Sequence, residues 1–234
     1  MISELENVLI KNRSDFHPVV DFNPATEKLF HLDFTDNNKV LGASEIADTN
    51  LFAGYIDRTL KSNDATYGIG GYKENRTLYR RSELFAGEEA RSLHLGIDIW
   101  GAAGTPVYAA LGGRVHSFAY NNNFGDYGAT IILLHQLDAV AFHTLYGHLS
   151  LADLAKYQEG QYITRGQVVG HFGLPAENGN WPPHLHFQII HELYKKGDYP
   201  GVCKLSESEA YLKNCPDADL ILNMMKYAEP GSGR

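Results

Sequence analysis

The chain has 234 residues, of which 44% are hydrophobic and 21% are charged, values that are ordinary for a globular protein. Its formal net charge of −8 argues against a nucleic-acid-binding protein, which needs a basic surface. The one notable basic doublet, Arg80-Arg81, is expected to be a solvated surface pair. Its apolar runs are all shorter than a membrane-spanning helix requires, so no transmembrane helix is expected.

The start of the chain, from Met1 to Asp15, lacks the basic beginning and long apolar core of a signal peptide. A cytoplasmic location is therefore expected if Met1 is the native start, and a periplasmic or secreted one if a signal segment has been removed. Cys203 and Cys215, the only cysteines, are too far apart for a Cys-x-x-Cys pair and are expected to have no catalytic role.

The segment 1–85 reads as an irregular N-terminal extension that contains one helix. That helix is predicted over 45–61, where Ile46, Phe52, Ile56 and Leu60 recur at roughly helical spacing. The remainder of this extension is rich in Asn, Asp and Gly and is expected to form loops and turns.

The segment 86–195 forms the predicted β domain, in which short apolar and β-branched runs alternate with turn residues. A hairpin is expected around Gly112-Gly113, and a second one that turns near Leu137-Asp138. The further predictions are a short helix capped by Ser150, a strand over 162–173 broken by Gly166 and Gly170, and a last strand over 184–190. This spacing predicts a mainly β (α+β) fold built on an antiparallel sheet or a partly open barrel with a groove.

The segment 196–234 is predicted to be a helical C-terminal extension. Ser206 and Glu209 have the spacing of an S-x-x-E capping box, and the apolar stretch 217–227 follows. The predicted organisation therefore has three parts, 1–85, 86–195 and 196–234.

Two histidines in the last predicted strand are the first candidates for a functional site. Because side chains alternate along a strand, His184, His186 and Gln188 share one face, while Leu185 and Phe187 point into the core. By itself, His-x-His also fits a surface strand that alternates polar and apolar residues by chance.

A second candidate pair is His94 and Asp98, separated by Gly96. A straight strand of this length spans roughly 13 Å, so the two side chains converge only if the backbone bends at the glycine. Imidazole and carboxylate are both zinc ligands. The alternative is a buried Asp98 that accepts hydrogen bonds from a turn, with His94 incidental.

A third candidate, His148, closes a predicted strand, a frequent place for catalytic groups. The alternative is an idle histidine at a sheet edge. Together the three stretches offer four imidazoles and one carboxylate, and three ligands with an open position make a catalytic rather than a structural zinc site.

Other motifs and histidines give no competing site. His191-Glu192 begins like the H-E-x-x-H motif of zinc proteases, but its fifth position is Lys195, and no G-x-S-x-G motif occurs. The remaining strand histidines and Tyr146 are expected to have packing or surface roles; these histidines are His116, His135, His143 and His171.

The three stretches taken together resemble the lysostaphin/LytM-type zinc metallopeptidases, many of which are peptidoglycan endopeptidases. The resemblance rests on H-x-G-x-D at residues 94–98, Y-G-H-L at 146–149 and H-L-H-F at 184–187, in that order. It extends to the segments around 104–115, 125–135 and 165–173 and covers about half of the chain, residues 90–191.

This resemblance implies that His94, Asp98 and His186 bind one Zn²⁺ ion and that His148 and His184 are an unligated catalytic pair. It also implies an antiparallel β-sheet with a groove for an extended peptide. One histidine would take a proton from the zinc-bound water and the other would stabilise the developing charge or protonate the leaving amine.

The predicted function is zinc-dependent hydrolysis of peptide bonds, in peptidoglycan cross-links or related peptides. The alternative is a non-catalytic or latent module that binds peptide or peptidoglycan on the same scaffold, for example with the N-terminal extension lying over the groove.

Overall fold

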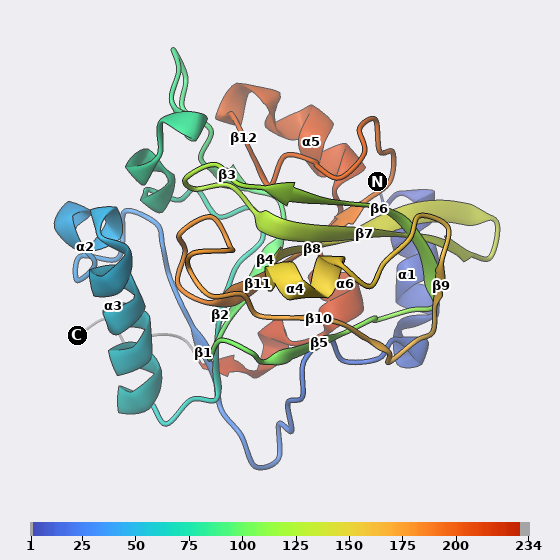
Figure 1. The fold of residues 1–234 in the computed structure, drawn as a ribbon, viewed down its shortest axis with the longest axis horizontal. Coiled ribbons are helices and arrows are strands. Elements are labelled where there is room, and N and C mark those ends of the chain that lie inside the picture. Colours follow the sequence, from blue (N-terminus) through green and yellow to red (C-terminus); the bar gives the residue numbers. More distant parts are fainter. Residues whose placement is uncertain (1, 230–234) are drawn as a thin grey trace.

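A computed structural model gives the structure of the chain and describes residues 2–229. Nine strands form one sheet, in the order β13-β1-β2-β4-β11-β8-β7-β6-β9 (Figure 1). These strands are β1 (Leu29–His31), β2 (Tyr67–Gly70), β4 (Ile97–Trp100), β6 (Gly113–Asn121), β7 (Gly128–Leu137), β8 (Val140–Leu149), β9 (Tyr162–Ile163), β11 (His184–Ile190) and β13 (Ala228–Glu229). Two smaller antiparallel pairs, β5 (Pro106–Tyr108) with β10 (Val168–His171) and β3 (Leu93–His94) with β12 (Val202–Cys203), complete the strands.

The large sheet is antiparallel except where β1 pairs in parallel with β2 and β13. Within the described residues it stays open, with β13 and β9 as its two edges, and does not close into a barrel. The predicted α+β fold with an antiparallel sheet is therefore confirmed. Two strands of the N-terminal extension, β1 and β2, lie in this sheet and were not predicted.

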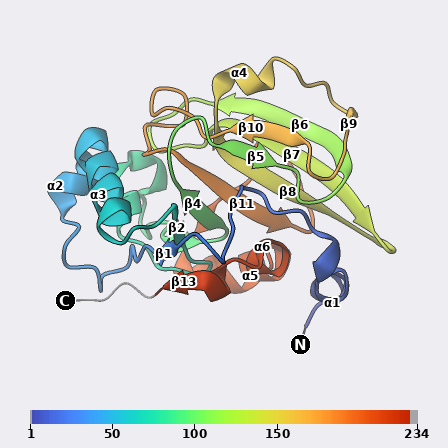
Figure 2. The ribbon, with the colours of Figure 1, turned by 90° about the horizontal axis from the view of Figure 1, so that it is seen from below.

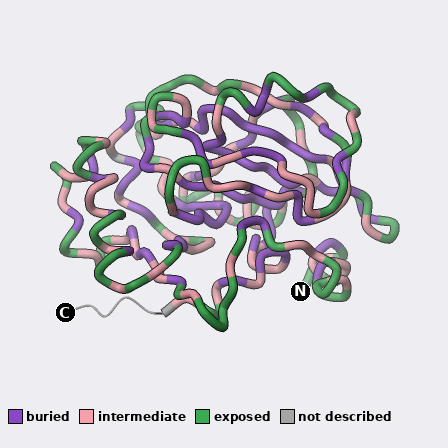
Figure 3. The backbone as a smooth tube through the Cα atoms, turned by 60° about the horizontal axis from the view of Figure 1, so that its bottom comes forward, coloured by how far each residue is buried: buried purple, intermediate pink, exposed green. Residues whose placement is uncertain are grey.

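The main core lies between one face of the large sheet and the β5–β10 pair (Figure 2). In β11 the alternation is as predicted, because Leu185, Phe187 and Ile189 enter this core while His184, His186 and Gln188 take the other face. The central strands are almost continuously buried (Figure 3), so the face that carries the histidines is covered as well.

The helices lie around the sheet. They are α1 (Glu4–Lys11), α2 (Ala43–Ala47), α3 (Thr49–Ser62), α4 (Leu151–Leu154), α5 (Ser208–Asn214) and α6 (Asp219–Leu222), with 3₁₀ turns at Arg13–Asp15, Leu78–Arg81, Glu83–Phe85, Leu205–Glu207 and Met225–Tyr227. No helix among the described residues has the length and apolar character needed to cross a membrane.

The helix predicted over 45–61 is two helices. Asp48 ends α2 and caps α3, because its side chain accepts from the backbone N–H groups of Asn50 and Leu51 at 2.8 and 3.1 Å. Phe52, Ile56 and Leu60 form the buried face of α3 as predicted, one turn apart.

The hairpin predicted around Gly112-Gly113 is wrong. The strand before these glycines, β5, pairs with β10, while β6 after them pairs with β7 and β9. A glycine pair marks where the chain changes direction but does not decide which strands become neighbours. The hairpin predicted near Leu137-Asp138 is confirmed, since β7 and β8 are joined by a tight turn in which Asp138 has φ of 51°.

The predicted capping box is also wrong. Helix α5 begins at Ser208, and Ser206 instead binds the carboxylate of Glu89, its backbone N–H lying 3.1 Å from Oε1. Ser150 does precede α4, but its side chain makes no capping hydrogen bond. Ser206 is engaged by Glu89, and the N–H of Leu151 at the start of α4 donates to Glu177 instead of to Ser150. The local sequence pattern does not contain these tertiary contacts.

Candidate metal centre

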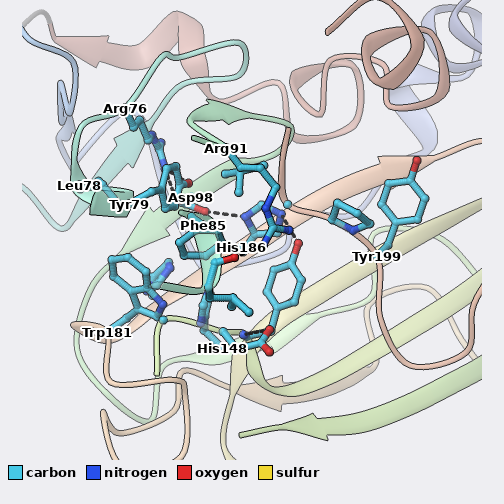
Figure 4. A pocket seen from close by; sticks show the side chains of 18 of the residues that line it. Arg76, Leu78, Tyr79, Phe85, Arg91, Asp98, His148, Trp181, His186 and Tyr199 are labelled. Atoms are coloured by element: carbon cyan, nitrogen blue, oxygen red, sulfur yellow. Dashed lines mark hydrogen bonds and ion pairs between the residues drawn. The ribbon is translucent and has the colours of Figure 1, made fainter. Parts of the chain in front are cut away.

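Four strands bring the predicted site residues together. In the sheet, His186 of β11 lies opposite Asp98 of β4 on one side and Gly147 of β8 on the other. His94 lies in β3, just before β4 in the chain. The strand conformation is interrupted at residues 95 and 96, between β3 and β4. Figure 4 shows Asp98, His186 and His148 facing one cavity.

Three side-chain atoms form a small triangle at the centre of this site. Nε2 of His94 lies 3.0 Å from Nδ1 of His186 and 3.3 Å from Oδ1 of Asp98, and the last two atoms are 2.9 Å apart. Among the described residues, this is the one group of three His, Cys, Asp or Glu side chains close enough to hold a metal ion.

The ring nitrogens of this triangle are free to act as metal ligands if the outer nitrogen of each ring carries the hydrogen. Nδ1 of His94 lies 3.0 Å from the carbonyl oxygen of Gly71, and Nε2 of His186 lies 2.9 Å from Oε1 of Gln188. Since each of these oxygens can only accept, the nitrogens facing them must donate, and in a neutral imidazole the other nitrogen is then an acceptor. Burial lowers the pKa of His94 to about 4, so its ring is neutral at pH 7.

In these tautomers two acceptor nitrogens and a carboxylate oxygen face one another in a buried place, which is a ligand set for a divalent cation. Zinc bonds of about 2.0–2.2 Å imply ligand separations of about 3.3–3.6 Å in a tetrahedron. The observed separations of 2.9–3.3 Å differ from these values by only a few tenths of an ångström, so the residues present fit a zinc ion.

Gly96 makes this approach possible by being small. A Cβ atom there would lie 2.6 Å from the carbonyl oxygen of Phe187 and 2.7 Å from Cε1 of His186. The bend predicted at Gly96 is present, but the reason is lack of space beside β11 rather than left-handed backbone geometry.

His148 reaches the site through a β-bulge. The register between β7 and β8 shifts between Ala129 and Ile131, and His148 has φ of 62°, which is uncommon for a residue other than glycine. A bulge turns a side chain away from the direction that regular alternation gives it. The ring of His148 consequently lies against that of His184, with centroids 4.0 Å apart.

Both of these histidines are held in one tautomer. Nδ1 of His148 donates to the carbonyl oxygen of Asn178 at 2.8 Å, and Nδ1 of His184 donates to that of Pro182 at 2.7 Å. Trp100 stacks on the other side of His184 with centroids 3.8 Å apart. Burial lowers the pKa of His184 to about 4 and that of His148 well below its usual value, so each ring is neutral and has Nε2 as an acceptor.

The cavity at this site has a volume of about 140 Å³. Tyr127 and Trp181 line it from the β domain, Tyr199 from the C-terminal extension, and Tyr79 and Phe85 from the N-terminal extension. None of the five predicted site residues is more than 6% exposed. The N-terminal extension thus covers the site.

Three neighbours of the site were not predicted: Tyr127, Arg76 and Arg81. The hydroxyl of Tyr127 lies 3.5 Å from Oε1 of Gln188. Arg81, expected in solvent, is half-buried, with its guanidinium 4.7 Å from the Trp181 ring centroid, whereas the side chain of Arg80 lies outside what the structure describes. Nothing in the local sequence around the three neighbours signals the site, because their role depends on which segments pack together.

The other strand histidines lie elsewhere. His116 and His143 contact each other edge to face, His171 contacts Asp153, and His135 is buried in the sheet. Cys203 and Cys215 are free and buried, and burial raises the pKa of Cys203 to about 11. These positions agree with packing or surface roles.

The fold and these three side chains define the class of protein. It has an open antiparallel sheet that carries a His–Asp–His group able to hold one divalent cation. Residues 92–199, which contain all five predicted site residues, match the model of peptidase family M23. The match covers just under half of the chain and confirms, for this segment, the resemblance to lysostaphin/LytM-type peptidases. No curated protein matches the chain.

Several solved structures are similar to the chain. A zinc-containing peptidase from Vibrio cholerae is 29% identical over 42% of this chain and 27% of its own length, with a TM-score of 0.33. The catalytic domain of the antimicrobial peptidase lysostaphin from Staphylococcus simulans is 22% identical over 69% of this chain and 98% of its own, with a TM-score of 0.40. A prophage-encoded M23 protein from Enterococcus faecalis is 21% identical over 47% and 80%, with a TM-score of 0.36. The chain thus spans about a quarter of the length of the Vibrio cholerae peptidase.

Proposed function

We propose that the protein is a zinc-dependent endopeptidase that hydrolyses peptide bonds of peptidoglycan cross-links or related peptides. The observation that carries this proposal is the buried triangle of His94, Asp98 and His186, whose two nitrogens and one oxygen lie 2.9–3.3 Å from one another. The match to family M23 supports the peptide substrate.

In this proposal His94, Asp98 and His186 hold the ion, and His148 and His184 carry the protons. A bound zinc ion would polarise the scissile carbonyl and lower the pKa of a water molecule to about 7. His148 and His184 both line the cavity, and each has an Nε2 acceptor fixed by a hydrogen bond from Nδ1. One imidazole takes a proton at Nε2 from the attacking water, and the resulting imidazolium gives that proton to the leaving amine and becomes neutral again.

The surroundings of the pair favour proton transfer over metal binding by these two rings. His184 is stacked between Trp100 and His148, so it cannot turn toward the triangle without breaking both contacts. Aromatic walls formed by Tyr79, Tyr127 and Trp181 exclude water and strengthen electrostatic interactions inside the cavity.

Two single substitutions test the division of roles. His186→Ala is expected to lose stoichiometric zinc, because two remaining ligands hold the ion poorly. His184→Ala is expected to keep zinc and lose hydrolysis, by about 100-fold or more. Zinc is measured by elemental analysis, and hydrolysis by mass spectrometry of digests of purified muropeptides and mixed peptides.

The control is the parent protein stripped of metal and then reloaded. The proposal fails if the parent binds no zinc, or if no peptide or muropeptide is cleaved by the zinc-loaded protein under any of these conditions.

A second candidate, a latent form of the same enzyme, is favoured by the burial of the site. Tyr79, Leu84, Phe85 and Arg91 line the cavity from the N-terminal side, so in this form the segment restricts the entry of substrate until it moves. In this case zinc binds to the parent but hydrolysis appears only after the segment has been cut or displaced. A parent that binds zinc and cleaves peptides at once excludes latency.

A further inference from the structure

Each of the three proposed ligands has an outer partner, and two of these partners come from outside the segment that matches family M23. Gly71 accepts from His94, Gln188 accepts from His186, and Arg76 contacts Asp98. We infer, on the basis of the proposed zinc site, that Arg76 is a positioning residue. It holds the Asp98 carboxylate so that only one of its two oxygens can bind the ion.

The contacts of the Asp98 carboxylate divide its two oxygens between different roles. Oδ1 faces the nitrogens of His94 and His186, and Oδ2 accepts a hydrogen bond from Nη1 of Arg76. A carboxylate held this way cannot rotate to offer Oδ2 to the ion or turn Oδ1 away from it. The guanidinium therefore sets which oxygen is available.

Arg76 is itself held firmly. Its Nε lies 2.5 Å from Oε2 of Glu74, and its Nη1 lies 3.2 Å from the hydroxyl of Tyr79. Its side chain is almost completely buried. A planar guanidinium can bridge two carboxylates and a hydroxyl at once, which an ammonium group cannot do.

The backbone places Arg76 beside the strand that carries His94. The Arg76 N–H donates to the carbonyl of Ser92 at 2.9 Å, and the His94 N–H donates to the carbonyl of Glu74 at 2.9 Å. Gly70 lies opposite Asp98 in the sheet and makes room for the guanidinium, because a Cβ there would lie 2.5 Å from Nη2 of Arg76. Through Arg76, the segment 70–76 thus holds the Asp98 carboxylate on the side away from His94 and His186.

The charges around Arg76 support a role in orienting the Asp98 carboxylate, because they do not add up to a positive charge that would repel the ion. Glu74 and Arg76 cancel each other, so the buried group of Glu74, Arg76 and Asp98 keeps one net negative charge for a cation. Burial opposes the charge on Arg76, but Tyr79, Asp98 and Glu74 raise its pKa above the usual range, so it stays protonated.

The decisive test compares zinc affinity in the double variant Glu74→Gln/Arg76→Gln with that of the parent. Because both charges are removed, the net charge near the ion is unchanged and only the hold on Asp98 is lost. Zinc affinity, measured by competition with a chromophoric chelator, is expected to fall about 10–100-fold. The visible spectrum of the Co²⁺-loaded protein is expected to change, because Asp98 is then free to turn both oxygens toward the metal.

Two further variants separate positioning from a structural role. Arg76→Lys keeps the charge but not the bridging fork, and its zinc affinity is expected to fall about tenfold. Leu9→Ala, which removes a buried side chain of α1 in the main core and outside the cluster that contains Tyr79 and Trp100, is expected to lower the melting temperature while zinc affinity and the Co²⁺ spectrum stay at parental values.

The outcomes are distinguishable from failure of the proposed function. If the parent itself binds no zinc, the proposed function fails before any variant is compared. If the parent binds zinc and the folded double variant binds it equally tightly, Arg76 has no positioning role. If the double variant does not fold, Arg76→Lys decides, and parental affinity in that variant overturns the inference.

Discussion

At the residue scale, the candidate site depends on which ring nitrogens carry hydrogen. Gln188 fixes this for His186, because its Nε2 donates to the carbonyl oxygen of Pro200 at 3.2 Å and to Sγ of Cys215 at 3.3 Å. Its Oε1 then faces Nε2 of His186, which favours the tautomer in which Nδ1 is the acceptor. A side chain that the sequence places only on the same strand face thereby prepares His186 for the proposed ligand role.

Substitution of Gln188 by leucine tests this dependence. Gln188→Leu removes the acceptor and leaves the Nε2–H of His186 without a partner, so the ring no longer presents Nδ1 reliably. Zinc affinity is expected to fall about 10–100-fold. Chelator competition measures the change, and Gln188→Glu, which keeps an acceptor at the same position, serves as the control. Parental zinc affinity in the leucine variant would rule out this role.

At the element scale, the β7–β8 hairpin supplies both His148 and a buried histidine that stabilises the sheet. His135 of β7 contacts the carbonyl oxygen of Gly112 at 3.0 Å and the hydroxyl of Thr144 at 2.7 Å. It therefore ties β8 and the start of β6 to β7. Burial lowers its pKa to about 4, which makes the stability of the hairpin dependent on pH.

Acid is expected to weaken the fold through His135. Between pH 6.5 and about 4, His135 is protonated in the unfolded chain but neutral in the folded one. The unfolded state then binds more protons, so the free energy of unfolding falls as the pH falls through this window, by up to about 3 kcal/mol. Urea denaturation at pH 7 and pH 4.5 measures the change, and in His135→Gln the difference between the two pH values should be smaller by most of this amount. An equal pH dependence in both proteins would contradict the assignment.

At the scale of the whole molecule, the N-terminal extension both completes the site and covers it. Strands β1 and β2 extend the large sheet beyond β4, and the turns at Leu78–Arg81 and Glu83–Phe85 lead over the cavity. Deletion of everything before residue 85 would therefore remove Gly71 and Arg76 together with the cover. Latency is better tested by loosening the cover alone. The division into three parts at residues 85 and 195 remains a prediction.

Loosening is achieved by Leu84→Ala/Phe85→Ala, which removes two apolar side chains that line the cavity. If the lost contacts lower the opening free energy by about 1.4 kcal/mol, a chelator removes zinc about tenfold faster. The rate is followed by stopped-flow absorbance. Leu51→Ala, at a half-exposed position of α3 outside the cavity, is the control and should show the parental rate. Equal rates in the parent and the double variant would show that these residues do not limit access.

The sequence by itself indicated most strands of the β domain and the face of β11 that carries His184 and His186, and it singled out five candidate site residues whose roles remain a prediction. It could do so because side-chain alternation is a local property of a strand and because the three motifs keep their order along the chain. Only the tertiary structure decided that β5 pairs with β10, that Gly71, Arg76 and Gln188 contact His94, Asp98 and His186, and that the segment 78–91 lines the cavity beside them. These are contacts between segments far apart in the chain, and they depend on packing, on the space left by Gly70 and Gly96, and on buried hydrogen bonds that no local pattern encodes.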